Sequence, residues 1–147
     1  MTIMYLGWAN SWMRPIFEEW DWKTNPVDIL LAYPYLREFY RAGERCGTTK
    51  IINESIRHWF FDSGAYSAFN SGDIIDHAEL MAAQKSRAWT DIASLDVIGD
   101  WQASRANYLT ERAAGIRTMP TFHIGDPWPL LHEYCRLAPK VALGGIA

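Results

Sequence analysis

From residue 27 onward, short apolar runs alternate with longer segments in which apolar residues recur at helical spacing. The short runs are typical of strands that are buried on both faces. Strands that alternate with helices of about 10–15 residues favour βαβ units and a parallel sheet. We predict strands at residues 27–33, 59–61, 91–98, 117–124 and 140–147, and helices at residues 34–42, 74–89, 103–114 and 126–137.

Local signals mark the ends and faces of these helices. Asp100 and Asp126 are candidate N-caps, and Gly115 is a candidate helix end. Apolar spacing predicts two buried helix faces. They are formed by Ile75, Ala78, Met81 and Ala82 in one helix, and by Ala106, Leu109 and Ala113 in the other.

The first 26 residues have a different character. They are rich in tryptophan, show no clean period and end in an Asn-Pro turn signal, although residues 1–9 could form one strand. We therefore expect an irregular N-terminal segment at residues 1–26, followed by five βα units at residues 27–147.

Polar or small residues gather at the carboxyl end of each predicted strand. In parallel α/β proteins, ligands bind outside the carboxyl ends of the strands, so these residues predict one convergent site. They are Tyr33, Asp62, Ser63, Gly64, Asp96, His123, Gly144 and Gly145.

Each candidate has a functional and a structural interpretation. Asp62 is a general acid/base candidate or a turn residue, and Asp96 needs either a partner or a ligand because its neighbours are apolar. His123 is a ligand-binding imidazole or a structural histidine. Tyr66 is a stacking ring or a core aromatic residue, and the backbone of Gly145 and Ile146 either faces a ligand or forms a tight strand exit. Carboxylates, a ring and exposed backbone N–H groups suit a purine-like base.

Composition narrows the function classes. The chain has 147 residues, of which 49% are hydrophobic and 21% are charged, with a net charge of −3. That charge predicts no strong phosphate-binding surface over the whole chain. The two cysteines, Cys46 and Cys135, form no metal-ligand cluster, and the sequence has neither a secretory signal nor a membrane-spanning run. We therefore expect a cytoplasmic protein with no membrane partner.

Five motifs in order resemble those of the tRNA-guanine transglycosylase (queuine tRNA-ribosyltransferase) superfamily. The likeness is to the small proteins of phages and of DNA 7-deazaguanine modification systems, over residues 27–147. The segments are Leu31-Ala32-Tyr33-Pro34-Tyr35-Leu36, Asp62-Ser63-Gly64-Ala65-Tyr66-Ser67, Leu95-Asp96, Phe122-His123-Ile124-Gly125 and Leu143-Gly144-Gly145-Ile146-Ala147.

The resemblance implies a (β/α)8 barrel that exchanges guanine in tRNA or DNA for a 7-deazaguanine. It also implies the role of each matching residue. Asp62 would be the catalytic acid/base, Ser63 and Tyr66 would bind the base with Tyr66 stacked on it, Asp96 would hold its N–H edge, and His123, Gly145 and Ile146 would lie at its carbonyl side.

The chain also departs from the family pattern. Ala65, Ser67 and His123 replace a Gly and two Gln, so the base preference is open. A complete barrel typically needs about 250 residues, and the family's nucleophilic Asp and its zinc site lie beyond the fifth strand. We therefore expect a partial barrel of about five parallel strands with no zinc cofactor. We expect it to bind a base but to exchange it only if another chain supplies the carboxylate.

Two alternatives remain open from the sequence. One is a metal-dependent hydrolase-like barrel that uses Asp62, Asp96 and His123 as ligands. The other is a non-catalytic half-barrel that binds a base or a partner chain. A second copy or a complementing chain would then cover its exposed sheet edges.

Overall fold

The computed structural model describes residues 6–8, 19, 21, 24–25, 27–45, 54 and 56–145. Most of the tryptophan-rich segment 1–26 lies outside the described residues, and so does Ile146. The predictions for them stay predictions.

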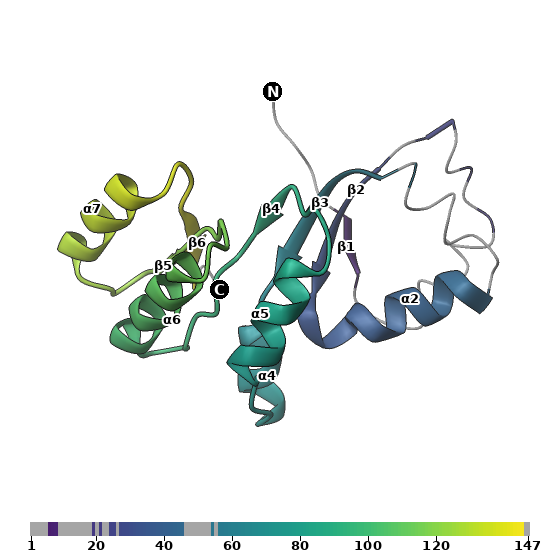
Figure 1. Ribbon diagram of the computed structural model, residues 1–147. Coiled ribbons are helices and arrows are strands. Elements are labelled where there is room, and N and C mark those ends of the chain that lie inside the picture. The colour runs from purple at the N-terminus through teal and green to yellow at the C-terminus, as the bar shows by residue number, and fades with distance from the viewer. Residues whose placement is uncertain are drawn as a thin grey trace.

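Parallel strands in two small sheets combine with helices, which confirms the mixed α/β class (Figure 1). The four strands of the first sheet pair in chain order, and both strands of the second sheet are parallel. The strands are β1 (Leu6–Trp8), β2 (Val27–Ala32), β3 (Ile56–Asp62), β4 (Asp91–Ile92), β5 (Thr121–His123) and β6 (Ala142–Gly144). The described helices are the 3-10 helix η2 (Tyr33–Tyr35), α2 (Leu36–Arg45), α4 (Ala65–Ser71), α5 (His77–Lys85), α6 (Trp101–Ala113) and α7 (Trp128–Leu137).

One parallel bridge, between Ala93 and Met119, joins the two sheets. The Met119 N–H donates to the Ile92 carbonyl at 2.7 Å, and the Ser94 N–H donates to the Met119 carbonyl at 2.9 Å. Neighbouring strands therefore follow chain order across the junction, without the reversal that marks a doubly wound sheet. Since all these strands are parallel, their carboxyl ends lie along one edge.

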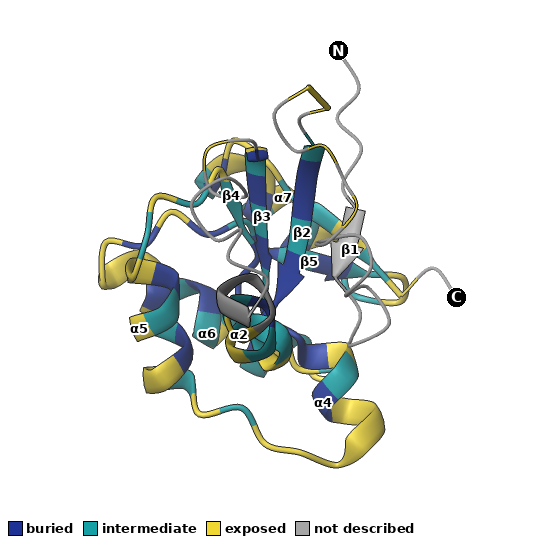
Figure 2. Ribbon diagram, turned by 90° about the vertical axis from the view of Figure 1, so that its right-hand side faces the viewer, coloured by how far each residue is buried: buried dark blue, intermediate teal, exposed yellow. Residues whose placement is uncertain are grey.

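One face of the strands is covered by helices. In the first sheet, Ile29 and Trp59 pack with Phe39 of α2, and Phe61 packs with Leu80 of α5. Burial along β2 and β3 alternates in part, because side chains of a strand point in turn to opposite faces (Figure 2).

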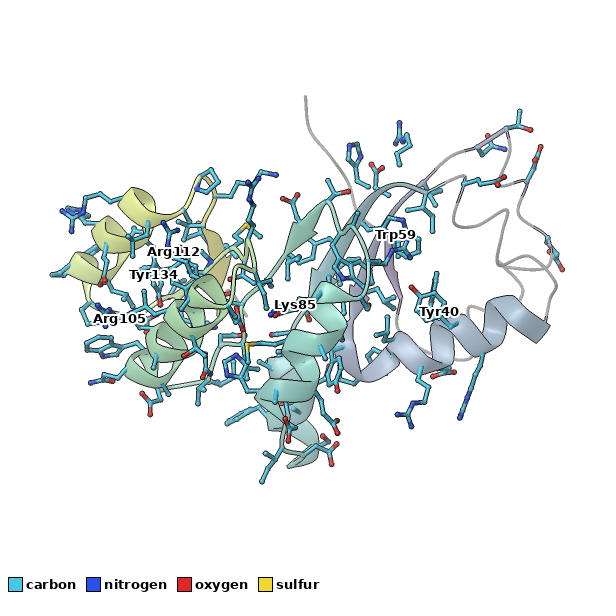
Figure 3. The ribbon with its side chains drawn as sticks, in the orientation of Figure 1. Tyr40, Trp59, Lys85, Arg105, Arg112 and Tyr134 are labelled. Carbon is cyan, nitrogen blue, oxygen red and sulfur yellow. The ribbon has the colours of Figure 1, made fainter. Side chains whose placement is uncertain are left out.

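The same face continues in the second sheet, where Phe122 of β5 packs against Tyr108 of α6 and Tyr134 of α7. The two tyrosine rings meet edge to face at a centroid distance of 5.5 Å. Arg105 binds Glu133 through two hydrogen bonds of 2.9 and 2.6 Å, which also joins α6 to α7. Figure 3 labels Arg105 and Tyr134 at this contact.

Element boundaries differ from the sequence predictions at several points. The strand predicted at 91–98 ends after β4 and its bridge at Ala93, because the chain then leaves the sheet and binds side chains of α6. Within the region of the predicted helix 74–89, only α5 is helical, capped by Asp76, whose carboxylate accepts from the Ala78 and Glu79 N–H groups. Helix α4 was not predicted, and it begins after Gly64, which has a φ of 76°.

The predicted buried helix faces are wrong in part. Helix α5 buries Leu80 and Gln84, whereas Ala78 and Ala82 are exposed. Helix α6 buries Ser104, Tyr108 and Glu111, whereas Ala106 and Ala113 are exposed. Apolar spacing fails here because polar side chains take part in the buried contacts.

One of the two predicted N-caps is confirmed. The Asp100 carboxylate accepts the Ala103 N–H at 2.9 Å at the start of α6. Asp126 does not cap α7: its carboxylate accepts the His123 N–H at 2.8 Å, and Pro127 occupies the cap position. No helix among the described residues is long and apolar enough to cross a membrane.

Candidate functional site

A cavity of about 440 Å³ lies at the carboxyl ends of the strands, on the face opposite the helices that the structure describes. The floor of the cavity consists of Leu30, Phe60, Ala93, Thr121 and Ala142. Along the strands, these residues alternate with the buried side chains that face the helices. At the strand ends it is lined by Asp62, Ser63, Tyr66, Asp96, His123, Gly144 and Gly145. Most of the residues that the sequence predicted to converge at this edge line the cavity. Tyr33 does not: its ring packs against Phe61, and its hydroxyl donates to Glu79 at 3.4 Å.

The turn after β3 depends on Gly64. Its φ of 76° lies in the left-handed region, and a Cβ at this position would overlap the ring of Pro34. The Gly64 N–H donates to the Asp62 carboxylate at 3.0 Å. Asp62 is therefore a turn residue whose side chain also lines the cavity, and its role as a general acid/base stays a prediction.

The environment of Asp62 favours its protonated form. Burial raises the pKa of its carboxyl above the usual range, the hydrogen bond from Gly64 opposes this shift, and the negative charge of Asp96 adds to it. A carboxyl group with a raised pKa in a cavity is a candidate for proton transfer to or from a ligand.

Asp96 connects three strand ends. Its Oδ1 accepts the hydroxyl of Ser63 at 3.1 Å, and its Oδ2 lies 3.1 Å from Nε2 of His123. Ser63 is only 1% exposed, so its hydroxyl is committed to Asp96. These two contacts hold the Asp96 carboxylate between the ends of β3 and β5.

His123 is fixed on its other sides as well. Its backbone N–H binds Asp126, and its Nδ1 lies 3.8 Å from the same carboxylate. Gly144 lies against the ring, since a Cβ on Gly144 would come within 2.7 Å of Cδ2 and 2.8 Å of Nε2 of His123. The imidazole therefore has little freedom to leave Asp96.

Two exposed aromatic rings lie on helix α4, one at this cavity and one at a neighbouring hollow. Tyr66 is 64% exposed and lines the cavity, so its face is accessible to a planar ligand. Phe69 is 62% exposed and lines a neighbouring hollow of about 270 Å³ together with Ile74 and Val97. The interpretation of Tyr66 as a core aromatic residue is wrong.

The structure brings together six of the seven predicted site residues, and Ile146 lies outside the described part of the chain. Sequence reasoning placed Gly144 at this edge without a binding role of its own, and it did not assign Asp126 to the site. The spacing of Asp126 three residues after His123 was a weak signal for the second. The floor residues were missed too, although the period of two along each strand could have identified them.

No Lys or Arg side chain lines this cavity within the described residues. Nor do the described residues contain a group of three or more His, Cys, Asp or Glu side chains that could hold a metal ion.

Comparison with protein-family models, with curated proteins and with solved structures found no match to this chain. The described residues establish a mixed α/β fold with parallel strands in two small sheets, and a function can be inferred only from the residues themselves.

Proposed function

We propose that this chain binds a guanine-like base, guanine or a 7-deazaguanine, in the cavity at the carboxyl ends of its strands. The observation that carries the proposal is Asp96, which is held between Ser63 and His123. Each carboxylate oxygen has two acceptor positions, so both oxygens keep a position for an N–H group of the ligand. The N1–H and 2-amino edge of guanine offers two such groups side by side.

The rest of the lining fits the same ligand. Tyr66 supplies an exposed ring for stacking, worth about 1–3 kcal/mol per base in nucleic-acid complexes. Gly144 and Gly145 bring backbone close to the ligand at the side of His123. A cavity of about 440 Å³ lies within the range of about 300–1,000 Å³ that small-molecule pockets occupy. A lining without Lys or Arg favours a base over a free phosphate group.

We also propose that the strands form part of a (β/α)8-type barrel. Three features support this: the strands are parallel, they follow chain order across the Ala93–Met119 bridge, and helices pack on one face while the cavity lies on the other. Open doubly wound sheets instead have helices on both faces.

The reaction that we propose is base exchange in tRNA or DNA, as the resemblance to the transglycosylases implies. Asp62 would act as the general acid/base beside the bound base, a role that its raised pKa suits. Exchange also needs a nucleophile that attacks the anomeric carbon of the sugar. We assign that step to none of the described residues.

Thermal denaturation with added ligand tests the binding proposal. Guanine and 7-deazaguanine should raise the Tm of the wild type, whereas adenine, which lacks the N1–H and 2-amino groups, should not. Asp96→Ala should abolish the shift. Stabilisation by Zn²⁺ or Mn²⁺ with no response to either base would overturn the proposal in favour of a metal-dependent hydrolase.

Incorporation of labelled guanine into tRNA and into duplex DNA tests the reaction. Incorporation into one of the two would identify the substrate. Base binding without incorporation into either would contradict exchange by this chain alone and favour the non-catalytic half-barrel.

A further inference from the structure

We infer that helix α6 positions Asp96 through three polar side chains on one of its faces, Ser104, Asn107 and Glu111. This inference rests on the proposed function, because it explains how the carboxylate that would recognise the base is held in place. The three residues are called the α6 polar face below.

The chain on either side of Asp96 lies outside the strands. After the bridge at Ala93, residues 94–98 have no regular secondary structure. The backbone groups of Leu95, which is only 8% exposed, must find other partners, since an unpaired buried N–H or carbonyl group is costly.

The α6 polar face supplies those partners. Glu111 Oε1 accepts the Leu95 N–H at 2.9 Å, and Asn107 Nδ2 donates to the Leu95 carbonyl at 3.2 Å. Ser104 Oγ accepts the Val97 N–H at 2.8 Å. Both residues next to Asp96 are thus bound by side chains of one helix.

The spacing of the three residues places them along one side of the helix, since positions three, four and seven apart share a face. Ser104 is 4% exposed, and Glu111 is fully buried. His77 of α5 also reaches Glu111 Oε1 at 3.0 Å, so the carboxylate is held from a second helix. Glu111 Oε2 has no hydrogen-bond partner, and stability alone does not explain a buried carboxylate that is only half satisfied.

The orientation of Asp96 follows from this arrangement. The Leu95 side chain packs in the core with Phe61 and Leu80, behind the strands. Asp96 is directed into the cavity, where it meets Ser63 and His123. Fixing the backbone at Leu95 and Val97 therefore fixes where the carboxylate can lie.

The test uses Asn107→Ala and Ser104→Ala, with Thr110→Ala as the matched control. Thr110 is exposed on the same helix, and its hydroxyl bonds only the Ala106 carbonyl. Three quantities are measured for each variant: amide hydrogen exchange at Leu95 and Val97, the imidazole ¹⁵N spectrum of His123, and the Kd for 7-deazaguanine. The first two need no ligand.

We expect both α6 variants to speed exchange at Leu95 and Val97, to alter the His123 spectrum, and to weaken base binding by about tenfold, the effect of one lost hydrogen bond. Thr110→Ala should match the wild type in all three measurements. Glu111→Gln, which keeps an acceptor for the Leu95 N–H, should weaken binding less than Glu111→Met, which does not.

The outcomes separate this inference from the proposed function. If the wild type binds the base and both α6 variants bind it equally well with unchanged exchange, the inference is wrong and the proposed function stands. If no base binds the wild type but the variants alter exchange and the His123 spectrum, the positioning of Asp96 stands and the proposed function fails.

Discussion

Asp96 receives contacts from residues that are far apart in the chain, and these contacts fix the position of its carboxylate in the cavity. Ser63 follows β3, His123 ends β5, and α6 holds the backbone beside Asp96. The sequence was sufficient to predict Asp62, Asp96 and His123, because polar residues at the carboxyl ends of parallel strands share one edge. The sequence also placed Gly144 at this edge, but it was insufficient to predict the close approach of Gly144 to the His123 ring, which depends on how β5 and β6 pair.

The raised pKa of Asp62 leads to a prediction about stability. Between the ordinary aspartate pKa of about 4 and the raised pKa, the native state binds more protons than the unfolded state. Stability contributed at this site therefore falls as the pH rises through that window, and it stays low above it. Asp62→Asn does not titrate and keeps an acceptor for Gly64, so it should be more stable than the wild type at pH 7.

Urea denaturation at several pH values measures this difference. Each unit by which the pKa is raised corresponds to about 1.4 kcal/mol at pH 7, and the advantage should vanish near pH 3. Asp73→Asn, at an exposed carboxylate outside the cavity, is the control for the loss of a carboxylate elsewhere in the chain. An Asp62→Asn variant that is less stable than the wild type at pH 7 would refute the pKa argument.

Gly144→Ala tests how tightly the imidazole is held. The added Cβ would lie 2.8 Å from Nε2 of His123, so the ring must move away from Asp96. We expect base affinity to fall at least tenfold, a loss of about 1.4 kcal/mol, with a smaller effect from Leu143→Ala, which alters an exposed side chain on the same strand. Calorimetric titration of both variants checks this, and equal affinities would contradict it.

In helix α6, the buried face that the sequence predicted differs from the buried face in the structure. Apolar spacing favoured Ala106, Leu109 and Ala113 as the buried face, yet Ser104 and Glu111 are buried. Their partners are backbone groups of a segment predicted to be a strand, so the two errors have one cause. Hydrophobic periodicity cannot identify a buried polar face, because the partners that satisfy it lie elsewhere in the chain.

The N-cap of α6 allows a second test at the scale of single elements. Asp100 caps the helix by accepting the Ala103 N–H, and loss of such a cap typically destabilises by about 1 kcal/mol. We expect Asp100→Ala to lower the free energy of unfolding by about that amount and to speed amide exchange at Val97, measured by urea denaturation and hydrogen exchange. Asp126→Ala is the comparison, since Asp126 does not cap α7; a similar loss of protection at Val97 in that variant would argue against the role of α6.

At the scale of the whole molecule, the Ala93–Met119 bridge joins the two sheets, so it bears on whether they unfold as one cooperative unit. The prediction of parallel strands in chain order agrees with the described strands, because short apolar runs between helices are a strong signal. The division into two sheets was not predictable from the sequence. It arises because the chain leaves β4 after a short pairing and finds its further partners on α6.

Native-state hydrogen exchange tests whether the two sheets form one cooperative unit. If one cooperative unit spans the bridge, the Met119 amide and the Ala142 amide, which donates to Pro120, should exchange with the same opening free energy as amides of β3. The opening free energies of the Met119, Ala142 and β3 amides should also decrease with urea concentration at the same slope. Earlier opening of β5 and β6 as a group would contradict a single unit.

The central claim is that Asp96 recognises a guanine-like base at the carboxyl ends of the strands. Calorimetric titration of 7-deazaguanine into the wild type, Asp96→Asn and Asp91→Asn tests it most directly. Asp91 pairs with Lys140 at the amino ends, so its variant controls for the loss of a carboxylate elsewhere. We predict one site per chain in the wild type and in Asp91→Asn, and no measurable binding to Asp96→Asn. Equal binding by all three proteins, or none by the wild type, would contradict the claim.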